Sequence, residues 1–465
     1  MLRFFKKYYP IRNLFFVAGE GIFIFLSALA AVLIIFGRSE LILDDWLLLK
    51  VFLITIVCQV CLYYNDLYDL RITESYNELG VRLLQALGFA AILLAFVYML
   101  FPQVIIATGT FIVSICFVMF LIVSWRFLYS IILNRGIFNQ KIVLLGSGQV
   151  VKDIKTEIQS KKDCGYSIEL EVPEKTEEDN SADPGVMATM GQNQFEGLSE
   201  MLLGHKIEKV VVGFREKRHI LPTRELLRCR VEGIDIIDGY DFYENLTGKL
   251  TVAALNPSWL IFSGGFQKSR ARRILKRSTD LILSVVMLIF CMPVFFITAV
   301  LIKFESKGPI FFSQERVGEK GRTYLVHKFR SMVADAEKQS GPVWAQTDDE
   351  RVTRVGRFIR QWRIDELPQL WNVLKGEMSF VGPRPERKFF VEKLEEILPF
   401  YTIRFTVKPG ITGWAQVSYG YGASVEDALE KLNYDLFYIK NMSVPMDLMI
   451  VLQTIKIVLF SKGAR

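Results

Sequence analysis

Two adjacent acids lie in the segment RIDELPQLWNVLKGEMSFVGPRPE, residues 363–386. Asp365 and Glu366 follow the cations Arg360 and Arg363 and precede the Gly-Pro-Arg-Pro stretch of residues 382–385. A carboxylate beside a second carboxylate, with arginines nearby, suits attack on a diphosphate. One acid can serve as the nucleophile, the other can hold Mg²⁺, and the arginines can neutralise phosphate oxygens. The segment therefore predicts phosphoryl-transfer chemistry.

Local structure should favour this chemistry. The residues after the acids are apolar at helical spacing, and Pro368 suits a first helical turn, so both acids are expected at or near a helix N-terminus. That position favours anions on the protein and on a substrate. Without metal the adjacent carboxylates repel and raise one pKa, a conflict that a divalent cation resolves. With three histidines in the chain, a histidine-rich metal site is excluded, and a hard cation on carboxylates is expected.

The composition is that of a membrane protein. The chain has 465 residues, is 51% hydrophobic and carries a formal net charge of +7. Part of this apolar content is expected in lipid, and the basic excess is expected to contact anionic head groups and phosphorylated substrates. Nucleic acid is not an expected partner, because the basic runs flank apolar segments.

Four apolar runs open the chain and are predicted to cross the membrane, at residues 14–36, 46–64, 84–101 and 104–125. Lysines and arginines precede the first run and follow the fourth, so both ends of this group should be cytoplasmic. Glu20 in the first run is either a functional ionisable group or one that reaches a neighbouring helix or the interface.

A fifth apolar run, residues 281–302, has strongly basic flanks on both sides. The positive-inside rule places both flanks in the cytoplasm, which predicts a re-entrant helix that turns at Pro293. The alternative, one ordinary span with a proline kink, would put the acid pair outside the cell. A last run, residues 447–460, contains Lys456 and predicts a helix at the membrane surface.

Between these membrane segments, residues 141–151, 207–214 and 233–239 read as strands of a parallel α/β sheet. Gly146 and Gly148 supply two of the three glycines of a dinucleotide fingerprint, while Val151 takes the third position. Either a bound nucleotide or a structural or regulatory Rossmann-like domain fits this pattern. Residues 173–185 are acidic and polar and predict a solvated loop.

Several long motifs follow the fifth run in order: SKGPIFFSQERVGEKG, HKFRSM, the segment around the acid pair, and VKPGITGWAQV. Over about residues 270–465 they resemble the bacterial sugar transferase family, the monotopic polyprenyl-phosphate glycosyl-1-phosphate transferases. The resemblance implies that Asp365 is the nucleophile and that Glu366, its acidic partner, holds Mg²⁺ together with Asp365. It also implies that phosphates are bound by four cations: Lys328, Arg330, Arg360 and Arg384.

The expected fold is membrane α-helical plus α/β, with four transmembrane helices in residues 1–135 and a Rossmann-like domain in 136–265. Residues 266–465 should form a mainly helical catalytic domain that contains the re-entrant helix.

The expected function is transfer of a sugar-1-phosphate from a UDP-sugar to undecaprenyl phosphate, with release of UMP, as the first membrane step of exopolysaccharide, capsule or O-antigen synthesis. The alternative is a membrane scaffold or nucleotide sensor without enzymatic activity. Expected partners are the two substrates, membrane lipids and a second copy of the chain in a dimer. The expected location is the bacterial inner membrane, with the catalytic domain facing the cytoplasm.

Overall fold

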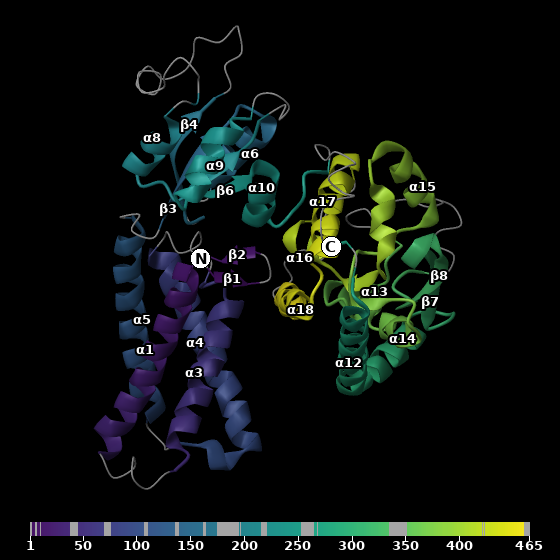
Figure 1. The fold of residues 1–465 in the computed structure, drawn as a ribbon. Coiled ribbons are helices and arrows are strands. Elements are labelled where there is room, and N and C mark those ends of the chain that lie inside the picture. The colour runs from purple at the N-terminus through teal and green to yellow at the C-terminus, as the bar shows by residue number, and fades with distance from the viewer. Residues whose placement is uncertain are drawn as a thin grey trace. The chain divides into compact units, whose positions relative to one another are not determined.

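A computed structural model of the chain is shown in Figure 1. It describes all residues except 1, 5, 6, 10, 38–44, 69–75, 107–109, 135–138, 161–163, 174–194, 196, 215–220, 253–264, 267, 334–350, 421, 423 and 460–465. The chain divides into two compact units, with the boundary between Gly239 and Tyr240. The expected division into three domains stays a prediction.

The first unit begins with two short paired strands, β1 (Leu2–Phe4) and β2 (Lys7–Tyr9), and then a group of long apolar helices. These are α1 (Ile11–Phe36), α3 (Leu47–Tyr64), α4 (Tyr76–Leu100) and α5 (Thr110–Asn134), with a 3₁₀ turn, η2 (Pro102–Val104), before α5. The first three are long and apolar enough to cross a membrane, and the described apolar part of α5 is the shorter Val113–Tyr129. The fourth run was predicted to begin at residue 104, but that residue ends the turn η2, and α5 begins at Thr110.

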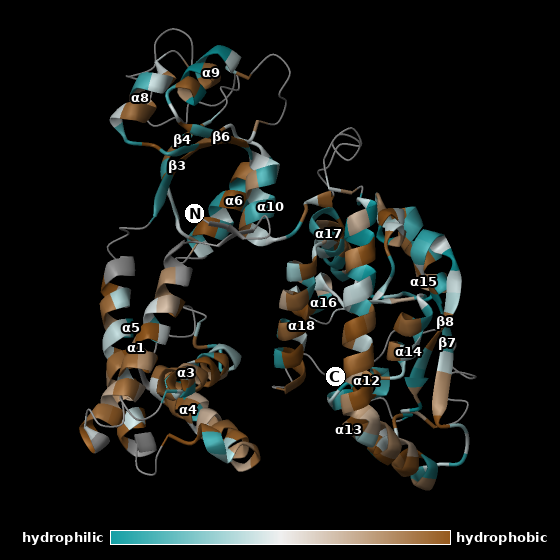
Figure 2. Ribbon diagram, turned by 60° about the horizontal axis from the view of Figure 1, so that its bottom comes forward, coloured by the Kyte–Doolittle hydropathy of each residue, from teal (hydrophilic) through white to brown (hydrophobic). Residues whose placement is uncertain are grey.

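The ribbons of this helix group are largely brown, the colour of hydrophobic residues, in Figure 2, and many of their apolar side chains are exposed. Ile34 and Ile92, for example, expose 62% and 69% of their surface. Helices with such faces suit a lipid environment, because every backbone polar group is satisfied within the helix. Inside the group, the guanidinium of Arg126 donates to the Glu20 carboxylate at 2.6 Å and to the Leu67 carbonyl at 2.8 Å. Glu20 thus pairs with a base on a neighbouring helix, which offsets the cost of burying its charge.

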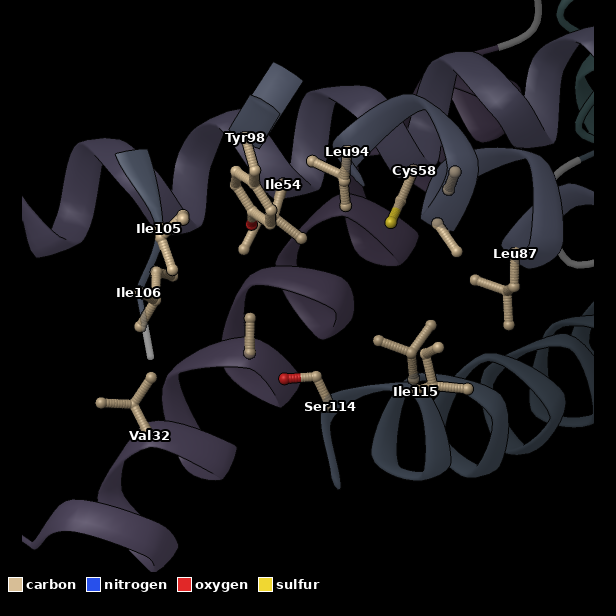
Figure 3. A pocket seen from close by; sticks show the side chains of 14 residues that line it. Val32, Ile54, Cys58, Leu87, Leu94, Tyr98, Ile105, Ile106, Ser114 and Ile115 are labelled. Carbon is tan, nitrogen blue, oxygen red and sulfur yellow. The ribbon is translucent and has the colours of Figure 1, made fainter. Parts of the chain in front are cut away.

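The same helices surround an apolar cavity of ≈ 60 Å³ (Figure 3). Residues from α1, α3, α4, α5 and the connection after α4 line it, among them Val32, Ile54, Leu87, Tyr98 and Ile115. Among the described residues, none that line the cavity is acidic or basic. It therefore offers no group for the phosphoryl chemistry that the sequence predicts.

A parallel α/β sheet follows the helices in the first unit. Its strands are β3 (Gln140–Leu145), β4 (Tyr166–Val172), β5 (Lys209–Val212) and β6 (Asp235–Asp238), in the order β4-β3-β5-β6, and all of them pair in parallel. The connecting helices are α6 (Gln149–Ser160), α8 (Leu198–Gly204) and α9 (Thr223–Val231). Three strands were predicted. The fourth, β4, was missed because alternating polar residues weaken its apolar pattern at the sheet edge.

The glycine turn after β3 lies where the strand order reverses, between β3 and β5. Gly146 has a φ of +103°, and a Cβ there would come within 2.7 Å of the Gly213 carbonyl oxygen. Val151 takes the position of the third fingerprint glycine, and a Cβ on Gly213 would lie 2.4 Å from its side chain. In a dinucleotide fingerprint, the third glycine lets the helix pack closely against the sheet. Here Gly213, directly after β5, provides that space instead. The predicted loop of residues 173–185 lies, after Pro173, outside the described residues.

The second unit is mainly helical and contains short pairs of strands. Its elements are α10 (Gly239–Thr247), α12 (Arg270–Glu305), β7 (Phe311–Val317), η4 (Glu319–Gly321), β8 (Thr323–Phe329), α13 (Arg354–Gln361), η5 (Ile364–Glu366), α14 (Gln369–Lys375), β9 (Ser379–Val381), α15 (Lys388–Ile397), η6 (Tyr401–Thr406), β10 (Gly410–Thr412), α16 (Trp414–Ser418), α17 (Val425–Asn441) and α18 (Val444–Leu459). β7 and β8 form an antiparallel hairpin, and β9 and β10 pair in parallel. The core packs around α17, where Leu432, Leu436, Phe437, Tyr438 and Ile439 are buried.

Helix α12 is one continuous 36-residue element that passes through Pro293. Near its start, Arg277 donates to the carbonyls of Val373 and Leu374, at 2.6 and 2.9 Å, and Asp280 accepts from the Ser379 hydroxyl at 2.8 Å. The middle of the helix exposes apolar side chains, with Phe290 and Phe296 at 79% and 73%. The beginning of α12 is therefore fixed to α14 and β9, and its centre presents an apolar surface.

The end of α12 is fixed to the same unit by a different set of contacts. Arg330 donates to the carbonyls of Ser306 and Lys307, at 2.8 and 3.1 Å. The Glu305 carboxylate accepts from the backbone N–H of Val355 at 3.0 Å. Both ends of the apolar helix thus bind one compact domain.

Helix α18 covers most of the last apolar run. It buries Met446, Asp447 and Ile450 against the unit, while Leu448, Leu452, Ile455 and Leu459 are 41–54% exposed. Their spacing of four, three and four residues puts them on one face of the helix. This apolar face agrees with the predicted helix at a membrane surface.

Candidate active site

The acid pair lies in the 3₁₀ turn η5, which leads into α14. Arg363 precedes the turn in the left-handed region, with φ +51°, and Pro368 caps the N-terminus of α14. This change of direction separates α13 from α14 and carries Asp365 and Glu366 inward, where they are 9% and 7% exposed. The prediction that both acids lie beside a helix N-terminus is therefore confirmed.

Three cations contact Glu366. Lys328 from β8 and Arg384 from the segment after β9 each approach Oε1 at 2.9 Å, and Arg363 approaches Oε2 at 3.7 Å. Their side chains remain 25%, 42% and 31% exposed. Because the acids are buried and the cations partly open, a bound anion would meet the cations first.

Burial raises the pKa of Asp365 to about 6; Lys328 opposes this rise and the charge of Glu366 adds to it. Burial also acts to raise the pKa of Glu366, but Arg384, Lys328 and Arg363 outweigh it and hold this pKa below its usual range. One acid of the pair is thus firmly ionised. The other is ionised at neutral pH yet more basic than an ordinary carboxylate, which suits a nucleophile.

The loop that carries Arg384 is fixed by the close approach of β9 and β10. Gly382 donates from its backbone N–H to the Thr412 carbonyl, and Gly410 donates to the Pro383 carbonyl, both at 2.9 Å. A Cβ on Gly410 would lie 2.1 Å from the Gly382 nitrogen, so this crossing needs glycine. The Gly-Pro-Arg-Pro and Lys-Pro-Gly-Ile-Thr-Gly motifs, far apart in the sequence, therefore meet here.

Asn372 fixes the strand that carries Lys328. This fully buried side chain donates to the Leu325 carbonyl at 2.7 Å and accepts from the His327 N–H at 3.1 Å. It also donates to Glu377 at 2.7 Å. A single amide on α14 thus holds β8 against the helix that follows the acid pair.

The other predicted phosphate-binding cations take different positions. Arg360 on α13 donates to the Ser331 hydroxyl at 2.8 Å, and its charge acts on Asp365. Arg330 is buried, and its guanidinium makes the contacts with Ser306 and Lys307 at the end of α12. The structure therefore brings Lys328, Arg360 and Arg384 to the acid pair but directs Arg330 away from it.

Sequence analysis noted Arg363 beside the acids but did not include it among the four phosphate-binding cations, and it did not identify Asn372. The position of Arg363 next to Asp365 and Glu366 was an available signal. Asn372 had none, because its partners on β8 come from a part of the chain about 45 residues earlier.

Two adjacent carboxylates are the available metal ligands at this site. Among the described residues, no group of three or more histidines, cysteines or acids could hold a metal ion. Mg²⁺ needs no such cage, because it commonly binds one or two carboxylates and completes its shell with water and substrate phosphates. The pair of buried acids fits Mg²⁺ in this substrate-dependent form.

Comparison with known proteins gives a consistent result. The family model described as "Bacterial sugar transferase" matches residues 271–461. The UDP-N-acetylgalactosamine-undecaprenyl-phosphate N-acetylgalactosaminephosphotransferase of Aeromonas hydrophila is 44% identical over 242 residues, 52% of this chain and 56% of that protein. A putative undecaprenyl-phosphate N-acetylgalactosaminyl 1-phosphate transferase of Bacillus subtilis is 49% identical over 138 residues, 30% of this chain and 76% of that protein.

A further relative extends the similarity toward the N-terminus. The undecaprenyl-phosphate galactose phosphotransferase of Salmonella typhimurium is 28% identical over 369 residues, 75% of this chain and 74% of that protein. The chain spans about half the length of the Aeromonas protein. Residues 271–461, which the family model matches, include the acid pair, its cations and α12 from its second residue on. The chain belongs to the bacterial sugar transferase family.

Proposed function

We propose that this protein transfers a sugar-1-phosphate from a UDP-sugar to undecaprenyl phosphate and releases UMP. The observation that carries this proposal is the buried pair of Asp365 and Glu366 with Lys328, Arg363 and Arg384 around it. Family membership supports the class of reaction, and the names of the relatives contain undecaprenyl phosphate as the acceptor.

In the proposed reaction, a carboxylate oxygen of Asp365 attacks the phosphorus that carries the sugar. The phosphoanhydride bond to the second phosphorus breaks, and UMP leaves with the bonding electron pair. An acyl phosphate then joins Asp365 to the sugar-1-phosphate. An oxygen of undecaprenyl phosphate attacks the same phosphorus and frees the carboxylate. Because one phosphoanhydride is broken and another formed, the overall reaction should be readily reversible.

The cations have distinct proposed tasks. Lys328 and Arg384 keep Glu366 ionised and lie at the open side of the acid pair, where phosphate oxygens of the substrate would bind. Arg360 adds positive charge near Asp365 and keeps more of this carboxyl ionised. In our proposal Arg330 acts differently, since it fixes the end of the membrane helix and not a phosphate.

Glu366, together with Asp365, would hold Mg²⁺. When bound, this ion supplies positive charge to phosphate oxygens and lowers the repulsion between the two acids. Glu366 suits the role because its pKa is low, so it needs no deprotonation to accept a cation.

The relatives use different sugars by name, among them N-acetylgalactosamine, glucose and galactose. Contacts with sugar hydroxyls decide such choices. Incubation of the purified protein with a panel of UDP-sugars and undecaprenyl phosphate, followed by assay of UMP, identifies the donor. Release of UMP from none of them would contradict the proposed function.

We further propose that α12 is re-entrant, with a hinge at Pro293, and that the acid pair faces the cytoplasm of the inner membrane. Two observations support this. A straight helix of this length would reach about 54 Å, well beyond a hydrocarbon core of about 30 Å, yet both its ends contact the same domain. The proline removes a backbone donor near the centre of the helix, where the side chains are apolar and exposed. A homodimer and a nucleotide bound at the parallel sheet stay predictions.

Replacement Asp365→Asn should lower turnover by about a thousandfold or more, because an amide keeps the shape of the side chain but cannot attack phosphorus. The measurement is the initial rate of UMP release with the best donor of the panel. Asp241→Asn, at a half-exposed acid of α10, is the matched control and should retain wild-type activity. Normal turnover by Asp365→Asn would remove Asp365 from the nucleophile's role.

Replacement Glu366→Gln should raise the Mg²⁺ concentration that gives half-maximal rate by about tenfold or more, because one anionic metal ligand is lost. A binding measurement complements the rate: Mn²⁺ titration with a bound UDP-sugar, followed by electron paramagnetic resonance. The Asp241→Asn protein serves as control in both titrations. If both remain at wild-type values, Glu366 does not hold the ion.

Single cysteines at Ala271 and Lys320 test the path of α12, in a background that lacks the six native cysteines. Both positions are exposed; Ala271 lies in the first turn of α12, and Lys320 follows the end of this helix. A membrane-impermeant maleimide should label neither in intact cells and both after the membrane is broken, while Asp45→Cys in the first loop should be labelled at once. Labelling of Lys320→Cys but not Ala271→Cys in intact cells would show that α12 spans the membrane.

A further inference from the structure

Arg404 is a buried cation that sequence analysis gave no role. It lies in η6 and is 7% exposed. Its guanidinium forms an ion pair with Asp435 of α17 at 2.9 Å, and it donates hydrogen bonds to the Tyr401 hydroxyl at 2.5 Å and to the backbone carbonyl of Arg384 at 3.0 Å. The last contact connects Arg404 to the active-site loop.

The loop of residues 382–386 is held from several sides. The pairing of β9 and β10 fixes its beginning at Gly382 and Pro383. Arg316 donates to the Pro385 carbonyl at 3.3 Å and fixes its end. Between these points lies Arg384, whose carbonyl accepts from Arg404 and whose side chain reaches Glu366 on the opposite side.

Because Arg404 is buried, loss of its ion pair or hydrogen bonds would leave an unpaired charge in the interior. A guanidinium in the interior needs an anionic partner, and Asp435, which is 2% exposed, supplies it. The ion pair holds the planar guanidinium beside Asp435, and Nη2 at its other side donates to the Arg384 carbonyl. A lysine could balance the charge of Asp435 but could not present donors in this planar arrangement.

We propose that Arg404, oriented by Asp435, is a positioning residue that fixes the backbone at Arg384 so that the Arg384 guanidinium reaches Glu366 and the substrate phosphate. This inference rests on the proposed function, since it deepens the role of Arg384 in that reaction. Arg404 itself contacts neither acid of the pair.

A double-mutant cycle tests the proposal. Arg404→Lys and Arg384→Lys should each lower kcat/KM by about tenfold to a hundredfold, the range for loss of a charge-assisted hydrogen bond. Both should do so with the same division between kcat and KM. The kcat/KM of the double variant should be no lower than that of the less active single variant, because the two residues act through one contact. Losses that multiply would overturn the proposal.

Tyr401→Phe is the matched control, because it removes one hydrogen bond of Arg404 and leaves the hydrogen bond of Arg404 to the Arg384 carbonyl in place. It should retain wild-type kcat/KM. A loss as large as that of Arg404→Lys would show that any disturbance around Arg404 impairs the enzyme, which contradicts a specific effect on Arg384.

Hydrogen exchange gives a readout that does not depend on turnover. In Arg404→Lys, backbone amides of residues 382–387 should exchange faster, while those of 432–439 in α17 should stay protected as in the wild type. Faster exchange in both regions would indicate a general structural role and overturn the proposal. If the wild type releases no UMP from any UDP-sugar, the proposed function fails, but this exchange pattern still tests the positioning.

If Arg404→Lys does not fold, the pair of changes Arg404→Met and Asp435→Leu removes both buried charges together. Such replacements often preserve stability. This folded variant should show the same fast exchange in residues 382–387 and the same loss of kcat/KM. Wild-type values in both measurements would contradict the proposal.

Discussion

The repulsion between two adjacent buried carboxylates is the constraint on which this catalytic domain depends. Asp365 and Glu366 cannot both be ionised in a poorly solvated turn unless positive charge is close. Lys328, Arg363 and Arg384 supply that charge, and they favour Glu366 over Asp365. The unequal pKa values of the two acids follow from this geometry and underlie the roles that we assign to them.

The scaffold serves to bring these cations together from distant parts of the chain. Asn372 fixes β8 and thereby Lys328, while the crossing of Gly382 and Gly410 fixes the loop of Arg384. The apolar helix α12 contributes to the same arrangement, because Arg277 near its beginning binds the carbonyls at the end of α14. Hydrogen bonds thus connect α12 directly to α14, the helix that follows the acid pair.

Much of this could be predicted from the sequence where the signal is local. The long apolar runs, the strands of the parallel sheet and the acid pair before a helix were all recognisable from periodicity and residue type. Strand β4 was missed, because its polar face hides the apolar one. The partners of Arg330 and Arg404 were out of reach, since an arginine in a motif reads the same whether it binds a phosphate or a backbone carbonyl. To assign the partners of these arginines, one must know the distances between segments that are remote in the sequence, and residue spacing does not give those distances.

The central claim is that Asp365 forms a covalent bond to the sugar phosphate. Mass spectrometry of the peptide that contains Asp365 tests it directly, after rapid acid quench of protein incubated with the donor UDP-sugar in the absence of acceptor lipid. Our account predicts a mass increase of one sugar phosphate on Asp365, with equimolar UMP, and its disappearance when undecaprenyl phosphate is added. UMP release and product formation at full rate, without any such adduct, would contradict the account.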